Sequence, residues 1–195
     1  MAREESVRRR KQRLTLFVFF FLSGLITATW ASRIPDIQQK LGFNNRELGN
    51  VLFAIPVGLV AGLLLAGKLV ARYGTRLVML AGCTLLAAVL LLIAFSANSW
   101  QLVLSLFFLG FFRTVFNLSI NTGAVDLQKQ YAAPIVSGFH GVWSVACLAA
   151  AGFGTLMIIN HVRPLWHFAA VAVLAILLAF LLRQGQKTGA PSNER

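Results

Sequence analysis

Six long apolar runs fill most of this chain, and they constrain its fold more than any other feature. A helix that crosses a bilayer needs about 20 mostly apolar residues, and each run approaches or exceeds this length. No stretch shows the alternation of apolar and polar residues that a transmembrane β-barrel requires. We therefore expect an all-α membrane protein with six transmembrane helices. The runs are Leu14–Ser32, Leu48–Val70, Leu77–Ser96, Leu102–Ala124, Ile135–Ile159 and Leu165–Leu182.

The basic residues are distributed unevenly among the segments that join these runs. With the amino terminus inside, six spans return the chain to the same side, and 13 of the 18 Lys and Arg residues lie in the cytoplasm. Four lie outside, and Arg113 falls within a span. This bias follows the positive-inside rule. The net charge of +12 therefore indicates orientation in the membrane, with both termini cytoplasmic, and no nucleic-acid partner.

The runs divide the chain into three segments. Residues 1–13 are expected to form a basic cytoplasmic tail, residues 14–183 the six-helix transmembrane domain, and residues 184–195 a polar cytoplasmic tail. We expect an external loop from Arg33 to Asn45, with Asn45 capping the second span.

Arg113 is the most unusual residue within the spans, because it lies near the middle of the fourth run. An arginine at the centre of a spanning helix costs about 2.5–3.5 kcal/mol on insertion scales, so it usually faces a water-filled cavity or a partner. Asn117 and Asn121 follow at four-residue spacing, which places the three side chains on one helix face. This stripe predicts either solute binding or hydrogen bonds between helices. No Asp or Glu lies deep in a span, which argues against proton coupling through a buried carboxylate.

Polar side chains in the first and fifth runs are further candidates for solute binding. His140 and Ser144 share one face of the fifth run with Trp143 beside them, and Thr27 shares a face of the first run with Trp30. His140 could bind a polar solute or carry a proton, or it could bond a neighbouring helix. Trp30 could instead belong to the aromatic belt at the membrane surface, and Thr27 could bond its own helix backbone.

A short basic segment, Gly67–Arg76, joins the second and third runs. Its Gly-x-x-x-x-Arg-x-Gly-x-Arg pattern resembles the cytoplasmic loop between spans two and three of the major facilitator superfamily of transporters. The glycines are expected to let backbones approach closely, and the arginines to supply donors for helix ends and carboxylates. The family's usual Asp falls at Ala71, so the usual charge partner is missing. The residues of this expected gating loop are Gly67, Arg72, Gly74 and Arg76.

The resemblance implies half of a major facilitator superfamily fold. Members have twelve spans in two six-span halves, and this chain resembles the amino-terminal half, with residues 184–195 similar to the start of the central linker. Three segments resemble a bacterial sugar-permease-like branch, which implies the bacterial inner (plasma) membrane. They are Ser32–Pro35, Asn121–Val125 and Ser137–His140.

Small residues repeat at four-residue spacing in the second and fifth runs. This spacing permits close helix contact, and spans two and five of the superfamily face the opposite half. The residues therefore expected to contact a partner half are Gly58, Gly62, Ala66, Ala146, Ala150 and Gly154.

The expected function is transmembrane transport of a small polar solute, sugar-like or an anionic metabolite, by alternating access. As a half-transporter in the lipid bilayer, the chain would need a homodimer partner or a separate second half. The alternative is a truncated or regulatory membrane protein that binds a partner and does not transport by itself. The expected solute-binding residues are Thr27, Trp30, Arg113, Asn117, Asn121, His140, Trp143 and Ser144.

The sequence carries no recognisable enzyme motif. Ser137-Gly138 follows Ile135-Val136, so it lacks the first glycine of the Gly-x-Ser-Gly motif of six-span intramembrane proteases. No His-Glu-x-x-His motif occurs either. Cys83 and Cys147 fall within spans and far apart, so neither a disulfide, a metal site nor a cofactor is expected.

Overall fold

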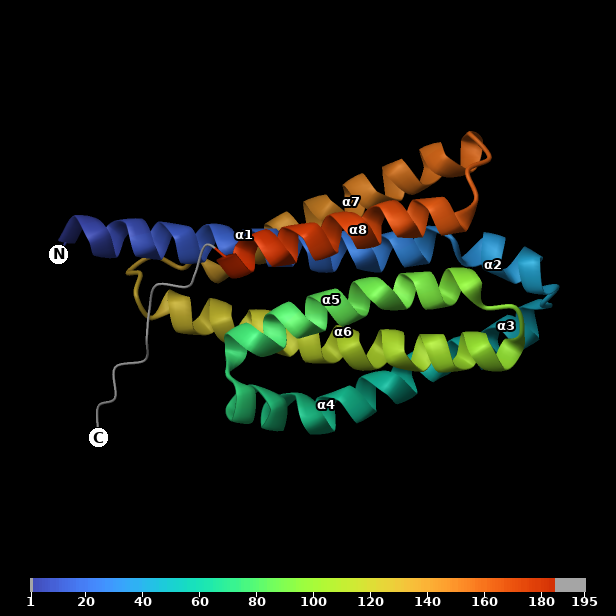
Figure 1. The fold of residues 1–195 in the computed structure, drawn as a ribbon, viewed down its shortest axis with the longest axis horizontal. Helices are drawn as coiled ribbons and strands as arrows, with labels where there is room; N and C mark the ends of the chain where they lie inside the picture. Colours follow the sequence, from blue (N-terminus) through green and yellow to red (C-terminus); the bar gives the residue numbers. More distant parts are fainter. Residues whose placement is uncertain (1, 185–195) are drawn as a thin grey trace.

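The computed structural model describes residues 2–184, which are helical apart from short turns (Figure 1). Six segments are long and apolar enough to cross a membrane, so the expected all-α fold with six spans is confirmed. Two spans are interrupted, so the six spans contain eight helices. The helices are α1 (Ala2–Ser32), α2 (Ile34–Leu41), α3 (Asn45–Leu52), α4 (Ala54–Tyr73), α5 (Thr75–Phe95), α6 (Ser99–Gln128), α7 (Val136–Ile159) and α8 (Pro164–Gln184).

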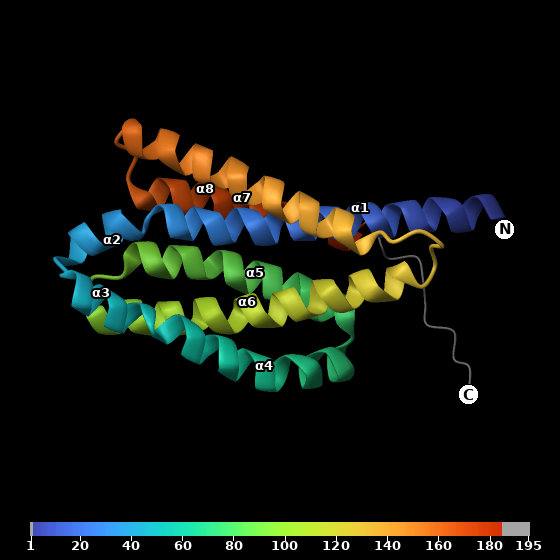
Figure 2. The ribbon, with the colours of Figure 1, turned by 180° about the vertical axis from the view of Figure 1, so that it is seen from behind.

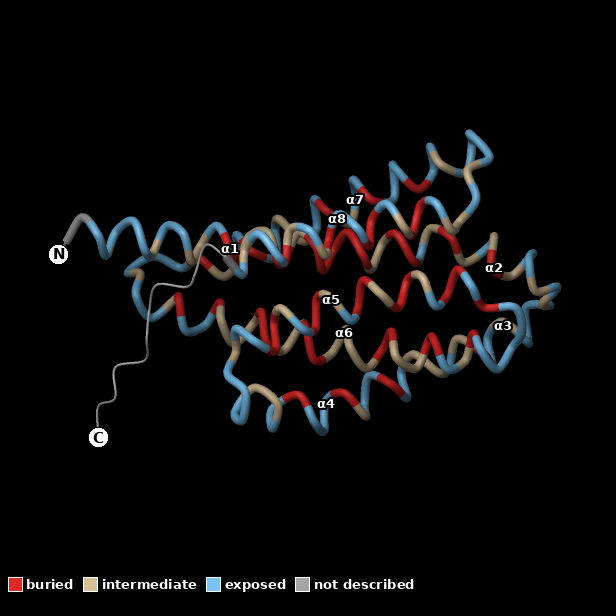
Figure 3. Tube along the Cα trace, in the orientation of Figure 1, coloured by how far each residue is buried: buried red, intermediate tan, exposed pale blue. Residues whose placement is uncertain are grey.

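The long helices form a bundle in which α1 and α6 are central. α4 packs on α6, α1 packs on α7, and α5 packs on both α6 and α8. Figure 2 shows α7, α1, α6 and α4 on the near side of the bundle, with α5 and α8 behind them. Buried positions concentrate along α1, α5 and α6, whereas α4 and α7 are largely exposed (Figure 3). We call the side formed by α7, α1, α6 and α4 the open side.

The first span differs from its prediction at both ends. α1 begins at Ala2, so the expected basic tail is helical and extends α1 beyond the bundle (Figure 1). Glu5 and Arg9 form an ion pair of 3.3 Å one turn apart, which favours this helix. At the other end, α2 lies where a loop was expected, and Pro35 occupies its first turn, where a missing N–H breaks no helical bond. α2 ends at Leu41 and is capped by Gly42, whose φ of 69° is readily adopted by glycine.

The second span is made of α3 and α4, which Phe53 separates. Asn44 caps α3: its Oδ1 accepts from the Glu47 backbone N–H, and the Glu47 carboxylate accepts from the Asn44 N–H, both at 2.9 Å. This reciprocal pair is a capping box. The prediction that Asn45 caps the span is therefore wrong by one residue. Of the polar tail expected at 184–195, only Gln184, the last residue of α8, lies within the described residues.

Candidate functional site

Arg113 lines a small cavity between α1, α4, α5 and α6. The cavity has a volume of about 30 Å³. Two other predicted solute-binding residues, Thr27 and Trp30, lie on its wall. The fold therefore brings candidates from the first and fourth spans together. The remaining wall is apolar and consists of Ile26, Ile55, Leu86 and Leu109.

The polar groups of this cavity have few partners. The Thr27 hydroxyl is buried and makes no hydrogen bond within the described part of the chain, so the alternative in which it bonds its own helix is wrong. Trp30 is only 6% exposed, which places it inside the bundle and not in an interfacial aromatic belt. Arg113 is partly exposed, and no hydrogen bond or ion pair joins it to another residue between 2 and 184. Asp126, the acidic residue of α6, lies more than three turns further along the helix, about 20 Å away.

The two asparagines on the Arg113 face make bonds within the protein. Asn117 Oδ1 accepts a hydrogen bond of 2.7 Å from the hydroxyl of Ser23, which is fully buried in α1. Asn121 Nδ2 donates to the backbone carbonyl of Asn117 at 2.7 Å. Neither asparagine lines the Arg113 cavity. Asn117 thus joins α6 to α1, and both side chains remain partly exposed.

The candidates in α7 lie apart from the Arg113 cavity. His140 and Ser144 are exposed, and the Ser144 hydroxyl donates to the His140 carbonyl at 3.1 Å. The His140 ring meets Phe20 of α1 edge-on, with ring centroids 5.3 Å apart. Trp143 is half-buried and packs against the core. His140 and Ser144 therefore present polar groups on the bundle surface beside α1.

The small residues of α4 pack inside the bundle, against α6. A Cβ atom added at Gly58 would collide with the carbonyl of Phe107, and one added at Gly62 would lie 2.6 Å from the carbonyl of Phe111. Ala66 is fully buried as well. The expectation that these three residues face a partner half is therefore wrong, because they allow α4 and α6 to approach closely.

The small residues of α7 pack inside the bundle in the same way, against α1. Ala146 and Ala150 are fully buried, and a Cβ atom added at Gly24 of α1 would lie 3.0 Å from the Ala146 Cβ. A Cβ atom at Gly154 would collide with the side chain of Ser32. These three residues also do not face outward, so the expected interface is wrong in α7 too. Small-residue spacing indicated close helix contact correctly, but not which helices meet.

The two glycines of the basic loop have different roles. Gly74 joins α4 to α5 with a φ of 79°, a conformation that favours glycine. Gly67 lies in α4, and no other side chain or backbone comes within 4 Å of a Cβ atom added there. Close backbone approach is therefore not the reason for a glycine at position 67.

The two arginines of this loop contact neighbouring groups at the same end of the bundle. Arg76 Nη2 donates to the carbonyl of Arg183 at 2.9 Å, so it provides the expected donor to a helix end, that of α8. The Arg72 guanidinium stacks over the ring of Tyr73, 5.3 Å from its centroid.

A buried polar pair that the sequence did not reveal lies at the other end of the bundle. The sequence predicts Arg33 in an external loop and gives no role to His167 of α8. Both side chains are 1% exposed, and Arg33 Nε donates to His167 Nδ1 at 3.1 Å. Arg33 Nη1 also pairs with the carboxylate of Asp36 at 3.3 Å. A histidine within the last apolar run was the available signal, but its partner emerges only from the packing of the helices.

Comparison with known proteins defines the family to which this bundle belongs. Residues 15–195 match the family described as Major Facilitator Superfamily. Because the match covers most of the chain and the six spans agree with it, the chain belongs to this superfamily of transporters.

Three bacterial relatives illustrate the similarity. The chain is 29% identical over 167 residues to an uncharacterized MFS-type transporter of Yersinia pestis, a match that covers 86% of this chain and 44% of the relative. It is 26% identical to an uncharacterized transporter of Sinorhizobium fredii, covering 87% of this chain and 45% of the relative. It is 28% identical to the 4-hydroxybenzoate transporter PcaK of Pseudomonas aeruginosa, covering 89% of this chain and 40% of the relative. The chain thus spans less than half the length of these relatives.

Proposed function

We propose that this chain is one half of a transport unit that moves a small anionic or hydroxyl-rich solute across a bacterial inner membrane by alternating access. The observation that carries the proposal is Arg113, a cationic side chain in the middle of α6 with no acidic partner among residues 2–184. A guanidinium at this depth is stable only beside water or an acceptor, so the site favours a solute that supplies one.

The cavity chemistry suggests which groups the solute carries. A carboxylate or phosphate forms two parallel hydrogen bonds with a guanidinium, which suits Arg113. The unpartnered hydroxyl of Thr27 offers a further hydrogen bond, and Trp30 supplies a flat apolar wall. The name of the Pseudomonas aeruginosa relative gives 4-hydroxybenzoate as its solute, which combines a carboxylate, a ring and a hydroxyl group. An aromatic, hydroxylated organic anion therefore carries the groups that these three side chains would recognise.

A second half is needed to complete this binding site. The cavity beside Arg113 measures about 30 Å³, which is room for one water and not for an organic solute. Exposed polar groups of His140 and Ser144, and the partly exposed Asn117, lie on helices of the open side. Hydrocarbon does not solvate such groups. A second six-span half over the open side would cover them and enclose a larger chamber, with the solute bound between two halves that rock against each other.

The proposed arrangement also specifies the orientation of the chain in the membrane and the surface that contacts the second half. The turn between α4 and α5, with Arg72 and Arg76, lies in the cytoplasm under the positive-inside rule, and both termini with it. There it acts as the gating loop against the second half. The contact uses the exposed apolar flanks of α4 and α7, including Val60, Leu64 and Leu148, in place of the buried small residues.

Uptake by the purified protein in liposomes tests the proposal. Labelled 4-hydroxybenzoate, other organic anions and neutral sugars are offered to wild type, Arg113→Ala and Arg113→Lys. Loss of a charge-assisted contact of about 1.5–3 kcal/mol predicts roughly a tenfold to 100-fold fall in uptake of the anion for Arg113→Ala. Arg113→Lys keeps the positive charge and should therefore retain part of the anion uptake.

Arg46→Ala serves as the matched control, because Arg46 is an exposed arginine of α3 that is remote from the cavity. Its uptake should equal that of wild type. Normal anion uptake by Arg113→Ala, with equal protein inserted, would show that Arg113 does not bind the solute.

A further inference from the structure

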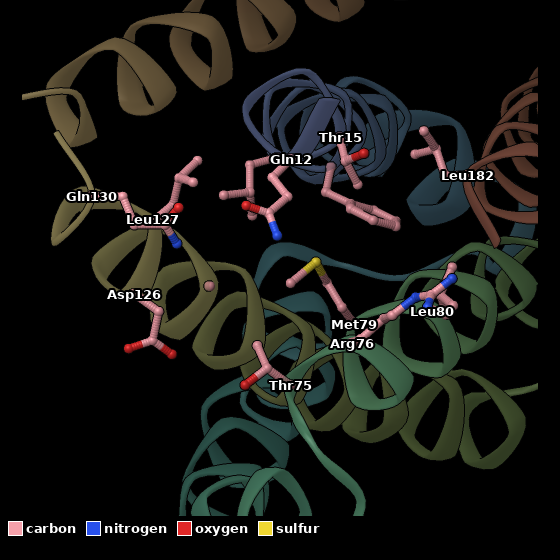
Figure 4. Close-up of a pocket in the computed structure, with 13 residues that line it drawn as sticks. Gln12, Thr15, Thr75, Arg76, Met79, Leu80, Asp126, Leu127, Gln130 and Leu182 are labelled. Atoms are coloured by element: carbon pink, nitrogen blue, oxygen red, sulfur yellow. The ribbon is translucent and has the colours of Figure 1, made fainter. Parts of the chain in front are cut away.

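A second cavity, of about 230 Å³, lies at the end of the bundle where α1 enters it (Figure 4). We call this end, which carries Arg8–Arg13, Arg72, Arg76 and Arg183, the basic end. Side chains from α1, α5, α6 and α8 line the cavity, and none of them lines the Arg113 cavity. It is therefore a separate site, and its occupancy does not depend on the proposed transport function.

The lining has an apolar and a polar part. Leu16, Phe19, Met79 and Leu127 contribute the apolar wall. Figure 4 shows the amide of Gln12 near Met79 in the cavity, with Thr75 and Arg76 on the α5 side. A cavity that is apolar on one wall and polar on the other suits an amphiphilic ligand.

The depth of the cavity matches the headgroup region of a bilayer. Gln12 lies just before the first apolar run, which begins at Leu14, and Thr75 is the first residue of α5. Leu182 of α8 lies two residues from the end of its helix. The walls are therefore built from the first two or last two turns of spans, where lipid phosphates and the start of the acyl chains are found.

The charges around the cavity favour an anion. Arg76 brings a permanent positive charge to the wall, and a guanidinium whose Nη2 already donates to the neutral carbonyl of Arg183 keeps that full charge. The acidic lining residue, Asp126, is already paired with Lys129 at 2.7 Å, so its charge is compensated. Basic pockets between spanning helices on the cytoplasmic side recognise anionic lipid headgroups.

Gln12 adds a requirement for a hydrogen-bond donor. Its Oε1 is buried and has no hydrogen-bond partner among residues 2–184. A buried acceptor without a donor is destabilising, so a ligand that brings an O–H group to Gln12 is favoured over a phosphate alone.

We propose that this cavity binds an anionic phospholipid with a hydroxylated headgroup, of the phosphatidylglycerol type. The lipid phosphate pairs with Arg76, a headgroup hydroxyl donates to Gln12 Oε1, and the apolar part of the lipid lies along Leu16 and Phe19. The bound lipid fills the space between α1, α5, α6 and α8 at the basic end.

Native mass spectrometry of the detergent-purified protein, titrated with phosphatidylglycerol or phosphatidylcholine, tests this site. We expect one saturable binding site for phosphatidylglycerol, with an affinity at least tenfold higher than that for phosphatidylcholine. Arg76→Gln should weaken it about tenfold, and Gln12→Leu should weaken it several-fold, from the loss of one charged and one neutral hydrogen bond. Arg72→Gln is the matched control, because Arg72 stacks on Tyr73 and does not line the cavity; its affinity should not change.

A variant that fills the cavity separates binding from folding. A Cβ atom at Gly123 would lie 3.0 Å from Met79 Cε and 3.3 Å from Leu16 Cδ2, so Gly123→Leu places a side chain among these apolar groups while Arg76 and Gln12 remain. It should reduce lipid binding even though helix content and the thermal midpoint, measured on the same sample, are retained. The proposal would be overturned if both lipids bound equally, or if Arg76→Gln and Arg72→Gln lost lipid affinity to the same extent. It would also be overturned if equimolar free glycerol 3-phosphate displaced the bound lipid completely. The last result would assign the cavity to a soluble phosphate.

Discussion

Arg33 Nε donates a hydrogen bond of 3.1 Å to His167 Nδ1 and thereby ties the chain between α1 and α2 to α8. Both side chains are 1% exposed. Because Nδ1 accepts this bond, the imidazole is neutral and carries its proton on Nε2. The pair fixes the end of α1 three residues after Trp30, and so supports the wall of the Arg113 cavity.

His167→Leu should destabilise the protein strongly. The change leaves the buried guanidinium of Arg33 with Asp36 as its remaining partner, and losing a buried hydrogen bond to a charged group costs about 1.5–3 kcal/mol. The unfolding free energy in detergent micelles measures the loss.

Two further variants show whether the bond itself is responsible. His167→Gln keeps an acceptor for Arg33 and should recover at least half of the stability that His167→Leu loses. His161→Asn changes an exposed histidine whose φ of 54° asparagine tolerates, and it should be close to wild type. Equal losses for the Leu and Gln variants at position 167 would contradict the hydrogen bond.

Gly58→Ala should weaken the packing of α4 on α6. The new methyl group would collide with the carbonyl of Phe107, so the helices must separate, at a cost of about 1–3 kcal/mol. The control is Gly152→Ala in α7, where no described atom outside the local helix backbone lies within 4 Å of the added Cβ. There the higher helix propensity of alanine predicts a neutral effect or a gain of up to about 1 kcal/mol. Both are read from thermal unfolding, and a stable Gly58→Ala protein would contradict the close α4–α6 contact.

Ser23 and Asn117 should show a small, specific coupling. Hydrogen bonds between spanning helices average about 0.6 kcal/mol in double-mutant cycles, so Ser23→Ala and Asn117→Leu together should cost less than the sum of the single changes by about this amount. Unfolding of the four proteins in the cycle gives the value. Strict additivity would show that the 2.7 Å bond is not formed in the membrane.

Single-cysteine labelling tests the proposed orientation. In a protein with Cys83→Ser and Cys147→Ser, a cysteine at Asn98 or Asn160 should react with an impermeant reagent outside intact cells. A cysteine at Thr75 should react only after permeabilisation. Labelling of Thr75→Cys from outside would reverse the orientation inferred from the positive-inside bias.

The six spans were predictable from hydropathy and length because the bilayer requires apolar side chains and backbone hydrogen bonds that are satisfied within each helix. Helix interruptions were harder to predict. The segment around Asp36 was expected to be a loop because Pro35 disfavours helix at Ile34, yet Pro35 lies in the first turn of α2, where proline is tolerated.

Within the candidate site, the sequence identified the residue whose burial in the membrane has a high free-energy cost, but not the positions of residues whose burial costs little. Arg113 stood out because a charge within a span requires an explanation. The small residues of α4 and α7 indicated close helix contacts. The same spacing, however, occurs both where helices of one half pack together and where helices of two halves meet. Arg33 and His167 could not be paired, because 134 positions separate them and only the packing of α8 beside α1 joins them.

We propose that this chain transports solute only together with a second six-span half. Native mass measurement of the protein extracted from its own membranes into polymer-bounded lipid discs, with uptake assayed on the same preparation, tests it most directly. We expect a complex of two copies of the 21.3 kDa chain, or of one copy with a second six-span polypeptide, and uptake only in preparations that contain this complex. Uptake by a single 21.3 kDa chain would show that no second half is needed.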